Sequence, residues 1–466
     1  MFEEDDVLTR NSILQLFRLE DEDIEQIKCR NVSGDMRADI RITPHEEPCP
    51  ECGSFSSVIK DYQVKKINHS MLKDRKCTLY YHQRRYRCKD CSRTFLEHNP
   101  FVFKGSSLSA MTIRNVLNDL KDYNETFASV ARRHDISPTT VASIFDAHVS
   151  IPRKTLPEHL VVDEVYAFRH HSDKYVFVML DYDTQKPVDI LNSRRDNILY
   201  SYFMSIPIEE RDKVKVMSFD MYPEYRSIMK RCFRNCIGCV DRFHLYQEFY
   251  RCMDRVRIRV MKGQKKKSDS YYLTKKFNWM LYKRSDDRDK DGKLLFDFNN
   301  PRKYNRKLNR LLNFYDIREL LFKVHPDLLS VWNLRNQMDT FYAKGPTHTS
   351  ADDLSDLIDM FRDSDVPEMN HFARTLARWK VEILNSLVIY KRTYRIDKGT
   401  GQMYVSEHTM NTAVLENRNS IIKCLKKNAN GYTCWERFRN RVLYVLDKDA
   451  TYSLNPIVKK ARQTDH

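Results

Sequence analysis

The stretch HLVVDEVYAF, residues 159–168, carries the clearest signal about the fold of this 466-residue chain. Its β-branched and aromatic side chains are typical of a buried strand, but two adjacent carboxylates, Asp163 and Glu164, interrupt them. Side chains alternate along a strand, so the two carboxylates should point to opposite faces of a sheet. Burying an unpaired carboxylate is costly or forces it to take up a proton. The stretch therefore predicts a strand in which at least one acid has a partner.

The sequence that follows predicts how this strand is used. The strand-like stretches are 159–168, 174–183 and 187–194, and two strand-then-helix units cover 213–233 and 236–249. Three strands followed by alternating helices and strands predict an RNase H-like α/β domain, a mixed sheet with helices on both faces. In that fold the first and fourth strands are neighbours. Asp163 and Asp220 should therefore converge, although 57 positions (220 − 163) separate them.

Two converging carboxylates indicate a bound cation. They repel each other unless a positive charge lies between them, and Mg²⁺ accepts such oxygens while keeping water ligands for a phosphate substrate. A pair of such ions supports in-line displacement at phosphorus. We interpret Asp163 as a ligand of Mg²⁺ (or Mn²⁺). For Glu164, on the other face, a helix-packing or hydrogen-bonded role is favoured over a direct catalytic one.

Four cysteines near the N-terminus predict a second kind of metal centre. They form two C-x-x-C pairs with 35 residues between them, enough for a strand hairpin: Cys49, Cys52, Cys88 and Cys91. Four thiolates suit tetrahedral Zn²⁺, and closed coordination leaves no catalytic position. Two chance cysteine pairs are the alternative, but the small residues after each pair, Gly53 and Ser92, argue against it. The pattern predicts a structural zinc ribbon.

A basic segment ends the stretch between the two cysteine pairs. Arg84, Arg85 and Arg87 flank Tyr86, as side chains that contact phosphates would. A plain solvated strand face is the alternative.

Residues 126–145, TFASVARRHDISPTTVASIF, fit a helix-turn-helix. Small or apolar residues stand where that motif packs: Val130, Ala131, Ile136, Val141 and Ile144. Ser137 and Pro138 form a helix start, and Asp135 tolerates the positive φ of the turn. The second helix would present Thr139, Thr140 and Ser143 to a major groove, with Arg132 and Arg133 near phosphates. An ordinary helical hairpin is the alternative.

The composition favours a soluble protein with a polyanionic partner. Hydrophobic residues make up 41% and charged residues 31%, and Lys plus Arg (80) exceed Asp plus Glu (64) by 16. No apolar run is long enough to cross a membrane, so we expect a cytoplasmic protein. No glycine-rich dinucleotide or P-loop motif occurs. Twelve cysteines in such a chain indicate metal ligands or core thiols before disulfides.

Between Asp220 and the C-terminal helices the chain reads as mainly helical, which predicts a large α-helical insertion. It carries two charged stretches, 262–267 and 283–293, which we expect to be exposed loops, with Lys265, Lys266 and Lys267 favoured for DNA contact. Three more cysteines, Cys232, Cys236 and Cys239, lie near His244. The helix, turn and strand pattern around them favours core thiols over a second zinc site.

The predicted division of the chain has five parts. They are the N-terminal segment with the ribbon (1–104), the helix-turn-helix domain (105–152), the first part of the catalytic core (153–250), the helical insertion (251–405) and the C-terminal helix and tail (406–466).

An ordered series of motifs along nearly the whole chain resembles bacterial insertion-sequence transposases of the ISL-three family. The matching stretches are the two cysteine pairs with CSRTF and PFV, VDEVYAFR (162–169), FDMYPEYR (219–226), VDRFHLYQ (240–247), FARTLARWKVEIL (372–384), LENRNSIIKCLKKNANGY (415–432) and WERFRNRVL (435–443). That family joins a zinc ribbon and helix-turn-helix to a DDE catalytic domain.

The resemblance implies a DDE triad of Asp163, Asp220 and Glu416. It places Asp241, Arg242 and His244 next to the active site, as supporting or DNA-contacting residues. It also implies binding of double-stranded DNA, both terminal inverted repeats and target, by a homodimer or larger synaptic assembly associated with the bacterial nucleoid. Where the family usually has G-x-x-E-G, Ala413 and Asn417 replace the glycines.

Two other functions share some of these features. A catalytically silent DNA-binding regulator derived from such an enzyme would keep the ribbon and the helix-turn-helix. An RNase H-like nuclease without strand transfer would keep the triad and differ in its product. The intact Asp163, Asp220 and Glu416 favour the transposase.

Overall fold

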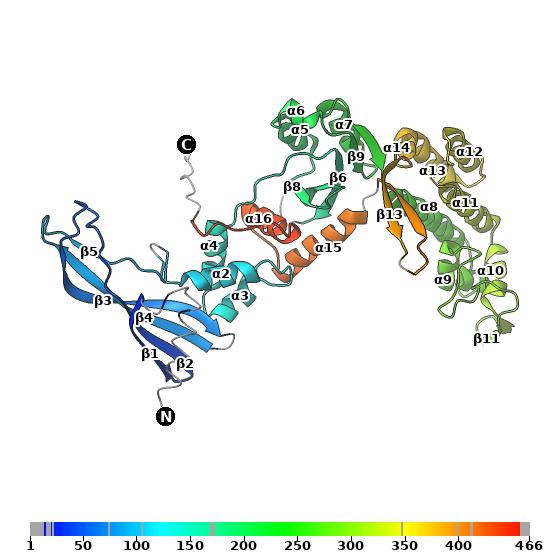
Figure 1. Cartoon of the computed structure of the whole chain (residues 1–466). Coiled ribbons are helices and arrows are strands. Elements are labelled where there is room, and N and C mark those ends of the chain that lie inside the picture. The colour runs from blue at the N-terminus through cyan, green and yellow to red at the C-terminus, as the bar shows by residue number, and fades with distance from the viewer. Residues whose placement is uncertain are drawn as a thin grey trace. The chain divides into compact units, whose positions relative to one another are not determined.

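The computed structural model describes residues 14, 20, 23–72, 75–103, 106–167, 173–345, 348–397, 399–410 and 413–456 (Figure 1). The acidic N-terminal stretch 1–10 and Phe168, the last residue of the opening stretch, lie outside this set. The chain forms two compact units, Met1–Pro152 with Ser420–His466, and Arg153–Asn419. We call them the zinc unit and the sheet unit. The motifs did not predict that the C-terminal segment belongs with the N-terminal one.

The zinc unit contains a five-stranded sheet of order β1-β2-β4-β3, with β5 pairing β4. Its strands are β1 (Ile24–Val32), β2 (Asp35–Ile42), β3 (Ser57–Leu72), β4 (Arg75–Cys88) and β5 (Thr94–Leu96). The antiparallel β3–β4 pair is the predicted hairpin between the cysteine pairs, and its register sets Ser57 opposite Cys88. Ile40, Ile67 and Leu79 have no exposed surface and form the core of this sheet.

Four described helices complete the zinc unit: α2 (Ala110–Asp119), α3 (Phe127–His134), α4 (Pro138–His148) and α16 (Trp435–Leu446). The predicted pair of helices and their turn are confirmed. Asp135 ends α3 with a φ of 51°, and the Ser137 hydroxyl accepts a hydrogen bond from the Thr140 N–H to cap α4, with Pro138 at the first helical position.

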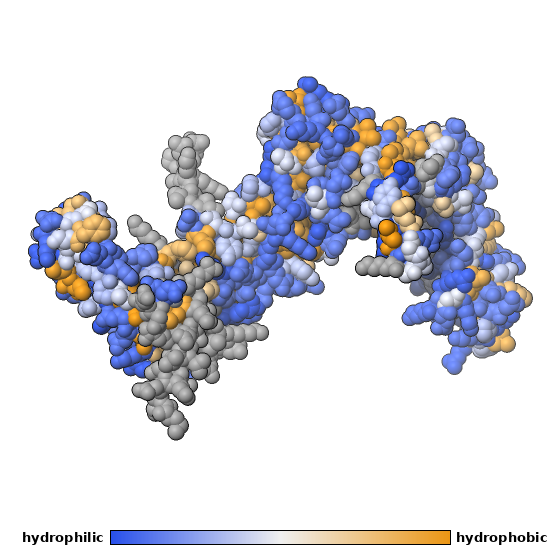
Figure 2. Space-filling model, viewed as in Figure 1, coloured by the Kyte–Doolittle hydropathy of each residue, from blue (hydrophilic) through white to orange (hydrophobic). Residues whose placement is uncertain are grey.

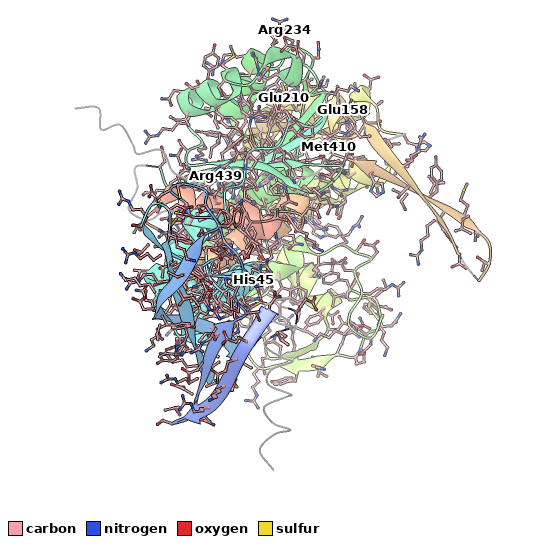
Figure 3. The ribbon with its side chains drawn as sticks, turned by 60° about the vertical axis from the view of Figure 1, so that its left-hand side comes forward. His45, Glu158, Glu210, Arg234, Met410 and Arg439 are labelled. Carbon is pink, nitrogen blue, oxygen red and sulfur yellow. The ribbon has the colours of Figure 1, made fainter. Side chains whose placement is uncertain are left out.

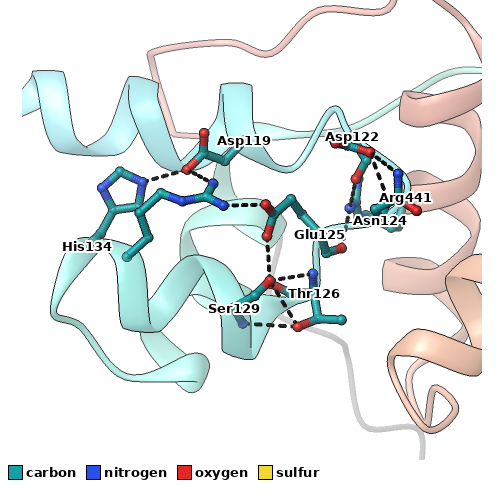
Figure 4. Close-up of polar contacts among 9 residues, drawn as sticks. Asp119, Asp122, Asn124, Glu125, Thr126, Ser129, His134 and Arg441 are labelled. Atoms are coloured by element: carbon teal, nitrogen blue, oxygen red, sulfur yellow. Dashed lines mark hydrogen bonds and ion pairs between the residues drawn. The ribbon is translucent and has the colours of Figure 1, made fainter. Parts of the chain in front are cut away.

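The C-terminal helix α16 is held against this pair by buried polar contacts. The Arg441 guanidinium, 1% exposed, donates 2.9 Å hydrogen bonds to the carbonyls of Asp122 and Glu125 between α2 and α3 (Figure 4). The Tyr444 hydroxyl donates to the Leu117 carbonyl, and the Tyr444 ring packs edge-on against Phe145 of α4. The C-terminal helix is therefore part of the core that holds the helix-turn-helix.

The sheet unit is built on a second five-stranded sheet of order β10-β9-β6-β7-β8. Its strands are β6 (His159–Tyr166), β7 (Tyr175–Asp181), β8 (Pro187–Leu191), β9 (Val216–Phe219) and β10 (Ile237–Val240). β6, β7 and β8 are antiparallel neighbours, whereas β9 is parallel to both β6 and β10. The first and fourth strands are therefore adjacent, as the sequence predicted.

Helices connect and cover these strands: α5 (Asp196–Met204), α6 (Ile208–Arg211), α7 (Pro223–Cys232) and α8 (Arg242–Lys262). Glu210 on α6, labelled in Figure 3, holds the segment that precedes β6, since its carboxylate accepts hydrogen bonds from Arg153 (2.6 Å) and the Leu156 N–H (2.8 Å). Packing behind β10 is close. A Cβ on Gly238 would lie 2.8 Å from the Phe219 ring, so this position requires glycine.

The rest of the sheet unit is mainly helical but not wholly so. Its helices are α9 (Asp269–Lys276), the 3₁₀ helix η2 (Asn278–Tyr282), α10 (Phe314–Phe322), α11 (Pro326–Ala343), α12 (Ala351–Arg362), α13 (Pro367–Arg378) and α14 (Lys380–Asn385). Two hairpins interrupt them, β11 (Lys303–Asn305) with β12 (Arg310–Leu312), and β13 (Ile389–Ile396) with β14 (Met403–Thr409). Tight turns explain both departures from the predicted helical stretch, because Asn309 has a φ of 51° and Gly401 a φ of 68°.

The β13–β14 hairpin exposes large apolar side chains, among them Tyr394 (64%) and Ile396 (65%). In Figure 2 the most hydrophobic residues of this hairpin are orange. The helix α15 (Ala413–Asn428) follows it and crosses the boundary between the two units. Of the helices in the described part of the chain, none is both long and apolar enough to cross a membrane.

Candidate active site and zinc centre

Asp163, within β6, and Asp220, just after β9, lie on neighbouring parallel strands. The β6–β9 register pairs Val161 with Ser218, and two further residues along each chain lead to the two aspartates. Asp163 is 8% exposed on β6, and Asp220 directly follows the last residue of β9. Burial raises the pKa of the Asp163 carboxyl. Burial, with the nearby carboxylates of Glu164 and Asp163, raises the pKa of Asp220 to about 6.

Glu164, the neighbour of Asp163 on β6, is contacted by two residues that the sequence did not single out. Its carboxylate forms an ion pair with Arg194 and accepts a 2.7 Å hydrogen bond from the Tyr225 hydroxyl. The Arg194 guanidinium in turn lies over the rings of Tyr175 (4.3 Å) and Tyr222 (4.8 Å). These contacts are those of the hydrogen-bonded partner that was favoured for Glu164.

The Asp241, Arg242 and His244 group lies at the start of α8. His244 Nδ1 is 3.2 Å from an oxygen of Asp241, which is 2% exposed. Burial alone would lower the pKa of His244, but Asp241, Asp163 and Asp220 together raise it. The Arg242 guanidinium lies 4.3 Å from the Tyr342 ring centroid. Within this group, His244 is the residue whose pKa both Asp163 and Asp220 raise.

The third predicted acid, Glu416, lies on α15 with an exposed side chain. One turn later Asn419 is 5% exposed, and its Nδ2 donates a 2.7 Å hydrogen bond to Asp163 Oδ2. Residues three apart on a helix share a face, so Glu416 lies on the face that reaches the aspartates. Among the described residues, only the cysteine cluster brings three or more potential metal ligands within 4.8 Å of one another. The structure thus places Asp163 and Asp220 on adjacent strands, and it does not bring the carboxylates of Asp163, Asp220 and Glu416 all within 4.8 Å of one another.

The four ribbon cysteines form a compact cluster. All of their Sγ atoms lie within 4.8 Å of one another, and the Cys49–Cys91 and Cys52–Cys88 pairs are 3.6 Å apart. A tetrahedron with zinc–sulfur bonds of about 2.3 Å has sulfur–sulfur edges of about 3.8 Å, so the spacing fits Zn²⁺. A disulfide needs sulfurs about 2.05 Å apart, and all four cysteines are free thiols.

Backbone geometry around the cysteine pairs explains why the cluster forms. Gly53 and Ser92, the small residues after each pair, adopt positive φ values of 73° and 60°. The Gly53 N–H donates to the Cys49 carbonyl at 2.8 Å, which closes the first turn. Backbone N–H groups of Cys52 and Glu51 lower the pKa of the Cys49 thiol to about 7. The sequence and the structure therefore agree on a structural zinc site.

Arg84 is a correction to the predicted phosphate-contacting segment. It is 1% exposed, and its guanidinium donates to the Ile42 carbonyl (2.6 Å) and to Glu97 (3.1 Å) while pairing with Glu25. Such a buried, ion-paired side chain holds the sheet together and does not face DNA. Strand alternation explains the difference, because Arg84 points into the core while Arg85 and Arg87 do not. Arg85 pairs with Asp61, and Arg87 is exposed.

The helix-turn-helix residues that were predicted to contact DNA also divide into exposed side chains and one that is enclosed by acids. Arg132, Thr139 and Ser143 are exposed, and Thr140 is partly exposed. Arg133 is instead enclosed by the carboxylates of Asp119 (2.6 Å) and Glu125, so it ties α3 to the preceding helix and loop (Figure 4). Of the two adjacent arginines, only Arg132 has its charge available to a ligand.

The remaining predicted candidates take ordinary structural places. Cys232 and Cys239 are buried in the core, and Cys236 is partly exposed with its thiol near the Ile237 carbonyl. Lys265, Lys266 and Lys267 are exposed beyond the end of α8.

Sequence reasoning missed Asn419, Arg194 and Tyr225. Asn419 stands three positions after Glu416, one helical turn along, and that spacing was the signal available for it.

A four-cysteine cluster and a mixed α/β sheet with aspartates on adjacent strands agree with the DDE transposase class that the sequence resembles. A family model of DDE transposases of the ISL3 type, described as "Transposase", matches residues 160–394, half of the chain. A second model, the zinc-finger of transposase IS204/IS1001/IS1096/IS1165, matches residues 45–91. The protein therefore belongs to the ISL3 family of transposases.

The chain also resembles the transposase for insertion sequence element IS1001 from Bordetella parapertussis. The two are 20% identical over 395 residues, which cover 84% of this chain and 86% of that protein. The similarity thus covers most of the length of both proteins.

Proposed function

We propose that this transposase binds the terminal inverted repeats of an insertion sequence and cuts and joins DNA strands through Asp163, Asp220 and Glu416 with Mg²⁺. The observation that carries the proposal is the adjacency of Asp163, within β6, and Asp220, just after the parallel strand β9. Glu416 would complete the set from α15, whose next turn is already bonded to Asp163 through Asn419.

The topology supports an RNase H-like assignment for the sheet unit. Three antiparallel strands in chain order, then two parallel strands added beyond the first, give the order β10-β9-β6-β7-β8. The mainly helical stretch after α8 fits a large insertion placed before the last catalytic helix, with two short hairpins included.

The donor set fits Mg²⁺ (or Mn²⁺). Asp163 and Asp220 supply hard carboxylate oxygens, and burial, the main cause of the raised pKa of each, makes their charged forms costly without a cation. When bound, the ion would activate a water or 3′-hydroxyl nucleophile and stabilise the leaving oxygen. Asp163 and Asp220 would hold it, with Glu416 as the third carboxylate.

Other residues of this chain organise the site around those acids. Arg194 and Tyr225 hold Glu164 and neutralise its charge, so it competes less for the cation. His244, raised in pKa by the surrounding carboxylates, balances negative charge beside Asp163 and Asp220. Asp241 orients the His244 ring from the first turn of α8.

The zinc unit would supply the DNA-binding surface. Arg132, Thr139 and Ser143 are exposed on or beside the second helix of the pair, and Arg87 is exposed near the ribbon. A net charge of +16 favours contact with the DNA backbone. Because transposition requires two element ends to be held together, the active form would be a homodimer or larger assembly on DNA, in the cytoplasm and at the nucleoid.

Cleavage of labelled DNA carrying the element's own ends tests this proposal. The native chain, Asp220→Asn and the control Asp286→Asn, whose side chain is 74% exposed, would be compared with Mg²⁺ and with EDTA. We expect cleavage and joined products from the native and control chains with Mg²⁺ only, and a loss of at least 1000-fold in Asp220→Asn. End binding without cleavage by the native chain would favour the silent regulator, and cleavage without joining would favour the simple nuclease.

A further inference from the structure

Asn419 carries a buried polar atom that its protein neighbours leave unsatisfied. The side chain is 5% exposed, and its Nδ2 donates a 2.7 Å hydrogen bond to Asp163 Oδ2. Its other end, Oδ1, is buried and accepts no hydrogen bond from the residues that the structure describes. Native proteins rarely leave a buried amide oxygen without a donor, because its lost hydration is then uncompensated.

The orientation of the Asn419 amide follows from the carboxylate that it meets. Turning the amide over would place two acceptor oxygens, Asn419 Oδ1 and Asp163 Oδ2, at the 2.7 Å separation now bridged by an N–H. The donor end therefore belongs to Asp163, and the acceptor end is left for something else. A partner for Oδ1 must be a hydrogen-bond donor or a cation.

We propose that Asn419 is a positioning residue of the active site that also contacts the hydrated metal ion. Its Nδ2 fixes the Asp163 carboxylate, and its Oδ1 binds the Mg²⁺ ion or accepts a hydrogen bond from one of its waters. This inference rests on the proposed function, since it deepens the assignment of the same carboxylate site. The hydrogen bond from Asn419 to Asp163 also fixes the position of α15 along β6, with Glu416 one turn before Asn419 on the same helix face.

Binding of Mn²⁺ to the zinc-loaded full-length protein, followed by electron paramagnetic resonance without DNA, separates this role from a merely structural one. The variants are Asn419→Ala, Asn419→Asp and the matched control Asn417→Ala, which alters an exposed asparagine on the same helix. Each variant is also melted without Mn²⁺.

We expect Asn419→Ala to weaken Mn²⁺ binding by about tenfold or more, the usual effect of losing a residue that orients a ligand. Asn419→Asp keeps an oxygen facing the ion, so its affinity should stay within about threefold of native, while its metal-free melting temperature falls because a third carboxylate joins the pair. Asn417→Ala should behave as native.

An Asn419→Ala chain that binds Mn²⁺ as tightly as native overturns the proposal. If its metal-free melting temperature also falls, Asn419 only anchors the helix. Asp220→Asn in the same titration separates the two levels of the argument. If native binds Mn²⁺ and Asp220→Asn does not, the metal site stands whatever Asn419 does; if native and Asp220→Asn are alike, the proposed function and this inference both fail.

Discussion

The zinc centre and the proposed Mg²⁺ site of this transposase are built in opposite ways. The zinc ligands come from two tight turns at one end of a single hairpin, and the four sulfurs enclose a closed site. The acidic site draws Asp163 from β6, Asp220 from the end of β9 and Asn419 from α15, and its carboxylates are raised in pKa. A closed site built from one local segment stabilises the fold. An open site assembled from distant segments keeps carboxylates close together, and their mutual repulsion would be relieved by a bound cation.

The largest effect should come from breaking the closed centre. Cys88→Ser removes one zinc ligand, and structural zinc contributes about 10–16 kcal/mol in small zinc domains, so the ribbon should lose its fold. We expect less than one bound zinc per chain, rapid proteolysis within residues 45–91 and loss of end binding. Cys434→Ser, which alters an exposed cysteine, is the control. Full zinc content in Cys88→Ser would show that the cluster is not the zinc site.

At the acidic site, neutralising a carboxylate should raise the stability of the metal-free protein, the opposite of the effect at the zinc site. The raised pKa of Asp220, about 6 against an ordinary 3.8, means that the metal-free folded chain loses stability as pH rises between those values. Asp220→Asn removes this penalty and should stabilise the metal-free protein above pH 6 by about 1–3 kcal/mol.

Thermal melts of both chains with EDTA in a narrow-range buffer series from pH 5 to 8 check this expectation. Because EDTA also threatens the zinc centre, the comparison is between the two chains at each pH. A variant that is less stable than native at pH 7.5 would contradict the view that Asp220 is held in an unfavourable charged state.

Removing the hydrogen bond from Tyr225 to Glu164, next to the acidic site, should have a smaller effect on stability. Tyr225 is 1% exposed, and its hydroxyl donates 2.7 Å to Glu164. Tyr225→Phe keeps the ring and removes a hydrogen bond to a charged group, so we expect a loss of about 1–2 kcal/mol by urea unfolding. Tyr200→Phe, at a partly exposed ring, is the control. An unchanged unfolding midpoint would mean that Arg194 alone satisfies Glu164.

The smallest expected effect concerns the surface of the zinc unit. Arg132 is exposed whereas Arg133 is enclosed by acids, so Arg132→Ala should weaken binding to end DNA by a few fold and reduce the slope of its salt dependence by about 1. Fluorescence anisotropy across a salt series measures both quantities. An Arg132→Ala slope equal to native would remove this residue from the DNA interface.

Local features were predictable from the sequence. The cysteine spacing with Gly53 and Ser92 specified the zinc turns, and Ser137 with Pro138 specified the start of α4, because each depends on residues a few positions apart. The adjacency of β6 and β9 was also predictable, since the order of strands and helices leaves few arrangements.

What could not be predicted depends on long-range contacts. Arg84 looks like its basic neighbours in sequence, and only its pairing with Glu97 and Glu25 shows that it is buried. The bond from Asn419 to Asp163 spans 256 positions, and the return of α16 to the helix-turn-helix depends on carbonyls that Arg441 reaches. Such contacts leave no local pattern in the chain.

The most direct test of the central claim changes which metal ion the acidic site binds better. Asp220→Cys replaces a carboxylate oxygen by a softer thiolate, which binds Mg²⁺ poorly and Mn²⁺ better. The account predicts that this variant fails to cleave end DNA with Mg²⁺ and recovers part of its activity with Mn²⁺, while the native chain cleaves with both. A folded Asp220→Cys chain that cleaves equally well with Mg²⁺, or that Mn²⁺ does not restore at all, would contradict the assignment of Asp220 as a metal ligand.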